Sequence, residues 1–143
     1  MGVDTIERKL PRNYKPSPEE KFMSAKQLRY FKQQLLDWKV DIIKEARETL
    51  DQLQEGGIQE SDLADRASTE TDWSLELRTR DRQRKLIAKI DEALGRIDRK
   101  DYGYCEVSGE PISLKRLEAR PIATMTLEAQ EAHERMEKVH RDD

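Results

Sequence analysis

The chain has 143 residues, of which 35% are hydrophobic and 40% are charged, and its mean hydropathy is −0.99. This length predicts about one domain. The composition excludes a large spherical core and is typical of long helices that each bury one narrow stripe. The 27 basic and 30 acidic residues leave a net charge of −3, which argues against direct sequence-specific binding to DNA.

Three further features bear on where the protein works. The apolar runs are only a few residues long, which excludes a transmembrane span, and the N-terminus lacks the apolar core of a signal peptide. The single cysteine, Cys105, excludes an internal disulfide framework. We therefore expect a cytoplasmic protein that does not contact the membrane, and we expect a monomer.

Residues 1–23 contain three of the five prolines and predict an irregular N-terminal arm. Ser24 is a good helix N-cap residue with Gln27 as its capping-box partner, so the first helix is expected from about Ser24 to Gln54. Apolar or small residues recur along it at spacings of three and four, as in a coiled-coil seam: Leu28, Phe31, Leu35, Trp38, Ile42, Ala46, Thr49 and Leu53.

A second long helix is expected from about Asp62 to Asp98. Because the pair Gly56-Gly57 separates two helices without proline, we expect residues 24–98 to fold back as an antiparallel hairpin. At about 1.5 Å per residue, each arm would be roughly 45 Å long. The seam of the second helix is patchier and consists of Trp73, Leu77, Arg84, Ile87, Ile90 or Asp91, Leu94 and Ile97.

The tip of this hairpin, near residues 58–67, carries Asp62 and Asp65, followed by the small residue Ala67. One interpretation is structural, because carboxylates in the first turn of a helix satisfy free backbone N–H groups. The other is that the carboxylates contact a metal, a water or a polar network in a partner's active site. The two are compatible, since Asp62 can cap the helix while Asp65 points outward.

Two groups of basic residues stand out. The first shares one face of the second helix, and the second lies on or just after a short helix expected near residues 113–119. Together they could bind a phosphorylated ligand, because guanidinium groups match phosphate oxygens; the alternative is a solvated charged surface. The two groups are Arg82, Lys85 and Lys89, and Lys115, Arg116 and Arg120.

Residues 99–143 change character. The run 101–112 is rich in turns, and a final amphipathic helix is expected from Thr126 to His140. Only one of four positions with zinc-knuckle spacing can supply a thiolate, so we predict no structural zinc. The lone cysteine is then either a half-buried remnant or a redox-sensing thiol. The four degenerate zinc positions are Cys105, Ser108, Thr126 and Ala129.

Several segments closely resemble the TraR/DksA family of RNA polymerase-binding transcription factors. The resemblance implies a mainly α fold, with a long antiparallel coiled-coil hairpin, a small zinc-finger-like globular domain and a C-terminal helix. Here that domain resembles the cysteine-poor branch of the family, for which zinc independence is expected. The matching segments are Asp62-x-x-Asp65-x-Ala67, Trp73 to Ile87, Asp101 to Cys105 and Arg116 to Pro121, within about residues 24–135 in unbroken order.

The resemblance also implies a function. Family members insert the coiled coil into the secondary channel of bacterial RNA polymerase and, with the alarmone ppGpp, modulate initiation in the stringent response. They repress ribosomal RNA promoters and activate some amino-acid biosynthesis promoters. A basic family position is Gln130 here, which removes one positive charge from the ppGpp site. Carried over, the tip residues are Asp62, Asp65 and Ala67, the polymerase contact is Arg82, and the ppGpp contacts are Leu86, Lys89 and Arg120.

Two other functions remain open. A Gre-like transcript-cleavage factor would use Asp62 and Asp65 to hold a metal in the polymerase. A structural coiled-coil adaptor would depend on the seam and not on the tip. The sequence contains no nucleophile–base pairing, glycine-rich phosphate loop or H-E-x-x-H segment, so we do not expect an enzyme in its own right.

Overall fold

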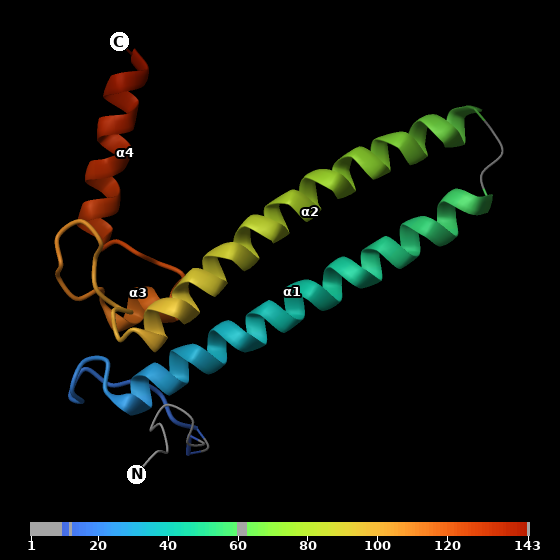
Figure 1. Cartoon of the computed structure of the whole chain (residues 1–143). Coiled ribbons are helices and arrows are strands. Elements are labelled where there is room, and N and C mark those ends of the chain that lie inside the picture. The colour runs from blue at the N-terminus through green and yellow to red at the C-terminus, as the bar shows by residue number, and fades with distance from the viewer. Residues whose placement is uncertain (1–9, 12, 60–62, 143) are drawn as a thin grey trace. The chain divides into compact units, whose positions relative to one another are not determined.

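The computed structural model describes residues 10–11, 13–59 and 63–142, with side chains throughout except at 53, 55–59, 63–69 and 141–142. In this part of the chain the fold is mainly α and contains no strand beyond an isolated bridge between Tyr104 and Pro111. Four helices follow one another along the chain (Figure 1): α1 (Ala25–Gln59), α2 (Leu63–Asp98), α3 (Leu114–Ala119) and α4 (Leu127–Asp142).

The chain divides into two compact units that share the two long helices. The head unit consists of Met1–Leu35 and Glu92–Asp143, and the hairpin unit consists of Leu36–Asp91. Within the hairpin unit, α1 and α2 run side by side in opposite directions (Figure 1). An ion pair of 2.7 Å between Lys39 Nζ and Asp91 Oδ1 joins the two helices and marks their register.

The start of α1 confirms Ser24 as the N-cap but not the capping box, because the Ser24 N–H donates to the Lys21 carbonyl and not to Gln27. Ser24 Oγ accepts a hydrogen bond from the Gln27 backbone N–H at 3.4 Å, as an N-cap residue does. The Gln27 side chain accepts from the backbone N–H of Met23 at 2.8 Å and donates to the Ser17 carbonyl at 3.3 Å. Because Gln27 is fully buried, these bonds fasten the described part of the N-terminal arm to the first turn of α1.

The glycine pair does not end the first helix. We expected the turn at Gly56-Gly57, but α1 continues through both glycines to Gln59. A glycine inside a helix costs about 1 kcal/mol relative to alanine, which weakens a helix without forbidding it. The connection at residues 60–62 lies outside the described residues.

The seam of α1 matches the prediction except at its far end. In the hairpin unit Ile42 is buried and Trp38 and Ala46 are half-buried, whereas Thr49 is exposed. Its hydroxyl donates to the Glu45 carbonyl on the same helix at 2.9 Å. Leu53 lies outside the described side chains.

The predicted seam of α2 is wrong over its middle. Leu77 is 59% exposed and Arg84 is exposed, whereas Ile90 is fully buried. Six residues separate Arg84 from Ile90, which at about 100° per residue places Arg84 about 120° around the helix from the seam. Seven residues return to within about 20° of it, so Gln83 and then Glu76 occupy the inner face.

Polar groups are therefore buried inside the hairpin. Glu76 is only 7% exposed, and Gln83 is half-buried. One carboxylate oxygen of Glu76 and the amide oxygen of Gln83 are buried without a hydrogen-bond partner among the described residues. A buried polar atom left without a partner costs free energy, so this part of the seam is held less tightly than the apolar part near Ile42 and Ile90.

The head unit has an aromatic and aliphatic core. The ring of Phe31 lies 5.5 Å from that of Tyr102, and both residues are buried. The Tyr102 hydroxyl donates to the Pro121 carbonyl at 2.7 Å, which satisfies its polar end. Gly103 has a φ of +94°, and a Cβ there would lie 2.9 Å from Met23 Cγ, so only glycine lets the arm approach this closely.

Glu76→Leu should stabilise the hairpin. Leucine removes a buried carboxylate oxygen that has no partner among the described residues, and it adds apolar contact, so the free energy of unfolding should rise by about 1–2 kcal/mol. Urea titration followed by circular dichroism measures this change. Glu48→Leu, at an exposed position of α1, is the control and should change stability by less than about 0.5 kcal/mol. A loss of stability in Glu76→Leu would show that the carboxylate has a partner.

Candidate functional site

The four degenerate zinc positions begin with a tight turn around Cys105. The backbone N–H of Cys105 donates to the Glu110 carbonyl at 2.8 Å, and its carbonyl accepts from the Gly109 N–H at 2.9 Å. The backbone N–H of Ser108 points at Cys105 Sγ at 3.5 Å. Cys105 is 3% exposed. The turn thus holds the sulfur inside the head unit.

Thr126 connects this turn to α4. Its hydroxyl lies 4.0 Å from Cys105 Sγ and accepts a hydrogen bond from the Ala129 backbone N–H at 3.2 Å. Thr126 is 8% exposed and immediately precedes α4, so it serves as the N-cap of that helix. The sequence predicts Thr126 as the first residue of this helix and as a lost ligand position; a threonine directly before an amphipathic run is also the signal of an N-cap.

The fold brings the four positions together, but their chemistry does not fit zinc. Structural zinc takes four thiolate or imidazole ligands, or occasionally a carboxylate. This set offers one thiol, two hydroxyls that stay protonated at neutral pH, and the methyl group of Ala129. Among the described side chains no cluster of three or more His, Cys, Asp or Glu residues could hold a metal ion. Hydrogen bonds to the sulfur, and one that the Ala129 N–H donates to Thr126 Oγ1, connect the positions instead.

The surroundings of Cys105 favour its thiolate. Burial raises the pKa of the thiol, but hydrogen bonds from the Ser108 side chain and from backbone groups of Ser108, Thr126 and Val107 outweigh it. Together they lower the pKa from 9.0 to about 6. The sulfur therefore carries negative charge near neutral pH and accepts hydrogen bonds from the same turn that would present a zinc ligand.

The basic group on α2 belongs to the hairpin unit. Arg82 and Lys89 are exposed and seven residues apart, so they lie on one side of the helix, with the half-buried Leu86 between them in sequence. Arg82 Nη2 lies 3.4 Å from Thr79 Oγ1. Lys85 forms an ion pair of 3.1 Å with Asp81, so part of this group is balanced surface charge.

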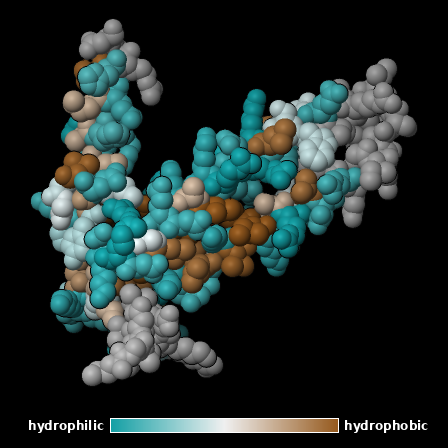
Figure 2. Space-filling model, viewed as in Figure 1, coloured by the Kyte–Doolittle hydropathy of each residue, from teal (hydrophilic) through white to brown (hydrophobic). Residues whose placement is uncertain are grey.

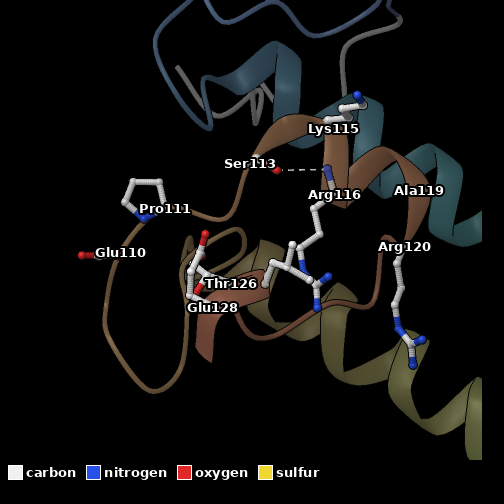
Figure 3. Close-up of a pocket in the computed structure, with 10 residues that line it drawn as sticks. Glu110, Pro111, Ser113, Lys115, Arg116, Ala119, Arg120, Thr126 and Glu128 are labelled. Atoms are coloured by element: carbon white, nitrogen blue, oxygen red, sulfur yellow. Dashed lines mark hydrogen bonds between the residues drawn. The ribbon is translucent and has the colours of Figure 1, made fainter. Parts of the chain in front are cut away.

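The second basic group lines a cavity in the head unit. Arg120 ends α3, and its backbone N–H donates to the Arg116 carbonyl at 2.8 Å. The cavity has a volume of about 510 Å³, and its walls include Arg116, Arg120, Lys115 and two acidic residues, Glu110 and Glu128. Figure 3 shows Arg116 and Arg120 extending the same way from α3, whereas Lys115 points elsewhere. The cavity therefore presents mixed charge with two guanidinium groups on one side.

Hydrogen bonds fix part of this wall. Arg116 Nε donates to the Met125 carbonyl at 2.9 Å, and Ser113 Oγ accepts from the Arg116 N–H at 3.1 Å as the N-cap of α3 (Figure 3). Arg120 has no such side-chain bond among those described. Gln130 donates to Glu134 on the same helix at 3.1 Å. Leu86 and Lys89 belong to the hairpin unit, and Arg120 belongs to the head unit.

The acidic tip is described only in part. Asp62 lies outside the described residues. Asp65 and Ala67 are in the first turns of α2, as the sequence predicts, but their side chains are not among those described. Their role stays a prediction.

Two family models match the chain over most of its length. The first, described as the N-terminal domain of the DnaK suppressor protein DksA, matches residues 27–97. The second, described as the prokaryotic dksA/traR C4-type zinc finger, matches residues 100–135. The RNA polymerase-binding transcription factor DksA of Caulobacter vibrioides is 64% identical over 131 residues, which cover 92% of each chain. The chain belongs to the DksA family.

Other DksA proteins agree in sequence and in fold. The Escherichia coli K12 factor of the same name is 39% identical over 125 residues, which cover 87% of this chain and 83% of the relative. The structure of transcription factor DksA2 from Pseudomonas aeruginosa superposes with a TM-score of 0.77 at 39% identity, covering 85% of this chain and 93% of that one. These relatives are named as DksA factors, which favours that prediction over a Gre-like cleavage factor.

The described helices are also informative about membranes. None of them combines the length and apolarity that a membrane span requires.

The lowered pKa of Cys105 predicts that the stability of the fold depends on pH. Because the folded-state pKa of about 6 lies below the ordinary value of 9.0, the thiolate stabilises the fold above pH 9 and this contribution is lost as the pH falls through about 6. The stability difference between the native protein and Cys105→Ser should therefore grow from pH 6 to pH 9. Thermal unfolding across this range measures the difference, and thiolate absorbance gives the pKa directly. An absorbance midpoint near 9.0 would contradict the proposed hydrogen bonding.

Proposed function

We propose that this protein regulates transcription initiation by binding bacterial RNA polymerase through its secondary channel. The observation that carries the proposal is the 64% identity, over 92% of both chains, to a protein named RNA polymerase-binding transcription factor DksA. The hairpin unit supports it physically, because two antiparallel helices form a narrow element that can enter a channel. At about 1.5 Å per residue, the parts of α1 and α2 that lie in this unit are roughly 35–45 Å long.

The proposed working end is the tip at residues 58–67. Asp62 and Asp65 would lie near the polymerase active site and alter its polar surroundings, while Ala67 permits close approach. The protein itself would catalyse no reaction, because its effect is to shift the lifetime of promoter complexes formed by its partner. Arg82, which is exposed on α2, would contact the polymerase and hold the hairpin in place.

The alarmone ppGpp is the proposed co-regulator. Leu86, Lys89 and Arg120 would contact it at the polymerase interface, and the pairing of Arg120 with Arg116 on one side of a cavity suits a phosphorylated ligand. Gln130 contributes no charge there, so binding would rest on fewer cations. With ppGpp the protein would repress ribosomal RNA promoters and activate some amino-acid biosynthesis promoters in the stringent response. It would act in the cytoplasm without contacting DNA bases or the membrane, and without zinc.

Asp62→Asn and Asp65→Asn should remove regulation while leaving polymerase binding intact, because the carboxylates act at the tip and the rest of the hairpin provides affinity. Transcription in vitro from a ribosomal RNA promoter, with a parallel polymerase-binding assay, measures both properties. Asp41→Asn, at an exposed position of α1, is the matched control and should repress like the native protein. If both tip variants repressed fully, the tip would have no regulatory role. Tip-dependent cleavage of RNA in stalled complexes would instead favour a Gre-like factor.

Lys89→Ala and Arg120→Ala should each raise the ppGpp concentration that gives half of the additional repression by about tenfold or more. Each variant removes a charge-assisted contact to phosphate. Repression without ppGpp should change little. Titration of ppGpp in the same transcription assay measures this shift. Lys138→Ala, on the exposed surface of α4, controls for general loss of positive charge. An unchanged ppGpp response in both variants would refute the proposed site.

A further inference from the structure

The turn around Cys105 is built from residues that do not fit zinc, so contacts other than metal ligation must hold it closed. Structural zinc supplies much of the folding free energy of a small zinc-binding domain. Here the Ile112 N–H donates to the Gly103 carbonyl at 2.7 Å, and the Cys105 N–H donates to the Glu110 carbonyl at 2.8 Å. These bonds close the turn upon itself. The end of the N-terminal arm, residues 13–24, lies in the same head unit and adds a second set of contacts.

Two side chains of the arm pack against this turn. The ring of Phe22 lies 5.4 Å from that of Tyr104 in an edge-on arrangement. Met23 packs on Gly103, where an added Cβ would lie 2.9, 3.0 and 3.1 Å from Met23 Cγ, Sδ and Cε. Gly103 and Tyr104 directly precede Cys105, which is 3% exposed. The arm therefore touches the turn at the two positions before its sulfur.

A hydrogen-bond network holds the arm in this position. Met23 has a φ of +52°, a strained left-handed conformation for a residue with a side chain. Its N–H donates to Gln27 Oε1 at 2.8 Å, and Gln27 Nε2 donates to the Ser17 carbonyl at 3.3 Å. The Ser17 N–H and the Tyr14 hydroxyl both donate to Glu20 Oε1 at 2.9 Å. Such strain persists only where the surroundings impose it, so the network and the contact with the turn fix the arm together.

The other end of the arm is anchored in the aromatic core. The ring of Tyr14 lies 6.1 Å from that of Tyr30, which lies 5.2 Å from Phe31. Phe31 in turn lies 5.5 Å from Tyr102, the residue before Gly103. Aromatic pairs at these distances stabilise a fold beyond the area that they bury. Contacts therefore lead from both ends of the arm to the segment that begins the turn.

We propose that residues 13–24 act as a strap that closes the metal-free turn and shields Cys105. When the strap is closed, Phe22 and Met23 form one wall of the turn. When the strap opens by local unfolding, the turn loses that wall and the sulfur becomes accessible, while the helices stay folded. The strap belongs to the folding of the head unit, so it goes beyond the proposed function and does not depend on polymerase.

The single cysteine reports whether the strap is open. Iodoacetamide alkylates Cys105 by forming one S–C bond and releasing iodide, and mass spectrometry of the full chain follows the rate. Phe22→Ala and Met23→Ala should each raise this rate by about tenfold or more, because each removes a contact that must break on opening. Lys21→Ala, at an exposed position of the arm, is the matched control and should stay within about twofold of the native rate.

Circular dichroism of the same variants shows whether the opening is local. Both alanine variants should keep the native helix content, and Phe22→Leu, which retains an apolar side chain, should react more slowly than Phe22→Ala. Unchanged alkylation in both alanine variants, or equal acceleration by Lys21→Ala, would overturn the proposal. Loss of helix in the alanine variants would also overturn it, because the arm would then be part of the global fold.

A double-mutant cycle tests whether Phe22 acts through the turn. Tyr104→Ala removes the other side of the same contact, so Phe22→Ala combined with Tyr104→Ala should react no more than about twofold faster than the faster single variant. If the two accelerations multiplied instead, Phe22 would act elsewhere and the strap would be refuted. None of these measurements involves polymerase, so their failure is distinct from failure of the proposed function.

Discussion

The head unit depends on what surrounds the sulfur of Cys105. In a four-cysteine zinc finger, one metal ion would join two knuckles that lie about twenty residues apart in the chain. Here the Ser108 backbone N–H and the Thr126 hydroxyl meet the sulfur instead, at 3.5 and 4.0 Å. Thr126 also caps α4 by accepting from the Ala129 N–H, so one side chain both closes the former site and starts the final helix. The neighbouring bonds from Arg116 to Met125 and from Tyr102 to Pro121 then fix the chain that leads to that cap.

The hairpin unit combines a firm apolar segment with a less stable polar one. Near Ile42 and Ile90 the seam is apolar and an ion pair sets its register, whereas Glu76 and Gln83 bury unpaired oxygens further toward the tip. The proposed entry of the tip into RNA polymerase would gain from a segment that can adjust there. The outer surfaces of the two helices also differ. Arg82 and Lys89 make one side of α2 basic, whereas Leu36, Val40 and Ile43 are exposed apolar residues of α1. Figure 2 shows hydrophobic residues gathered along the middle of α1.

Much of this fold could be predicted from the sequence because long helices have strong local signals. The cap at Ser24 and the regular spacing from Leu28 to Ala46 are both encoded within a few residues. The middle of the α2 seam could not be predicted, because the positions that face α1 there are polar. Leu77 and Arg84, nearby in the sequence, have seam-like spacing but are exposed. The end of α1 was wrongly predicted at the glycine pair, because glycine weakens a helix without ending it. The contact of Thr126 with Cys105 joins residues 21 apart and has no local signal at all. At the candidate site, sequence located the knuckle positions and the basic residues; only the fold shows that Arg116 and Arg120, but not Lys115, extend together.

We propose that hydrogen bonds, and no metal, hold the head unit together. The most direct test is the metal content of the purified protein, measured together with its thermal unfolding before and after treatment with a strong chelator. We expect far less than one zinc per chain and an unfolding midpoint that the chelator does not change. One tightly bound zinc per chain, with a large fall in the midpoint when it is removed, would contradict it.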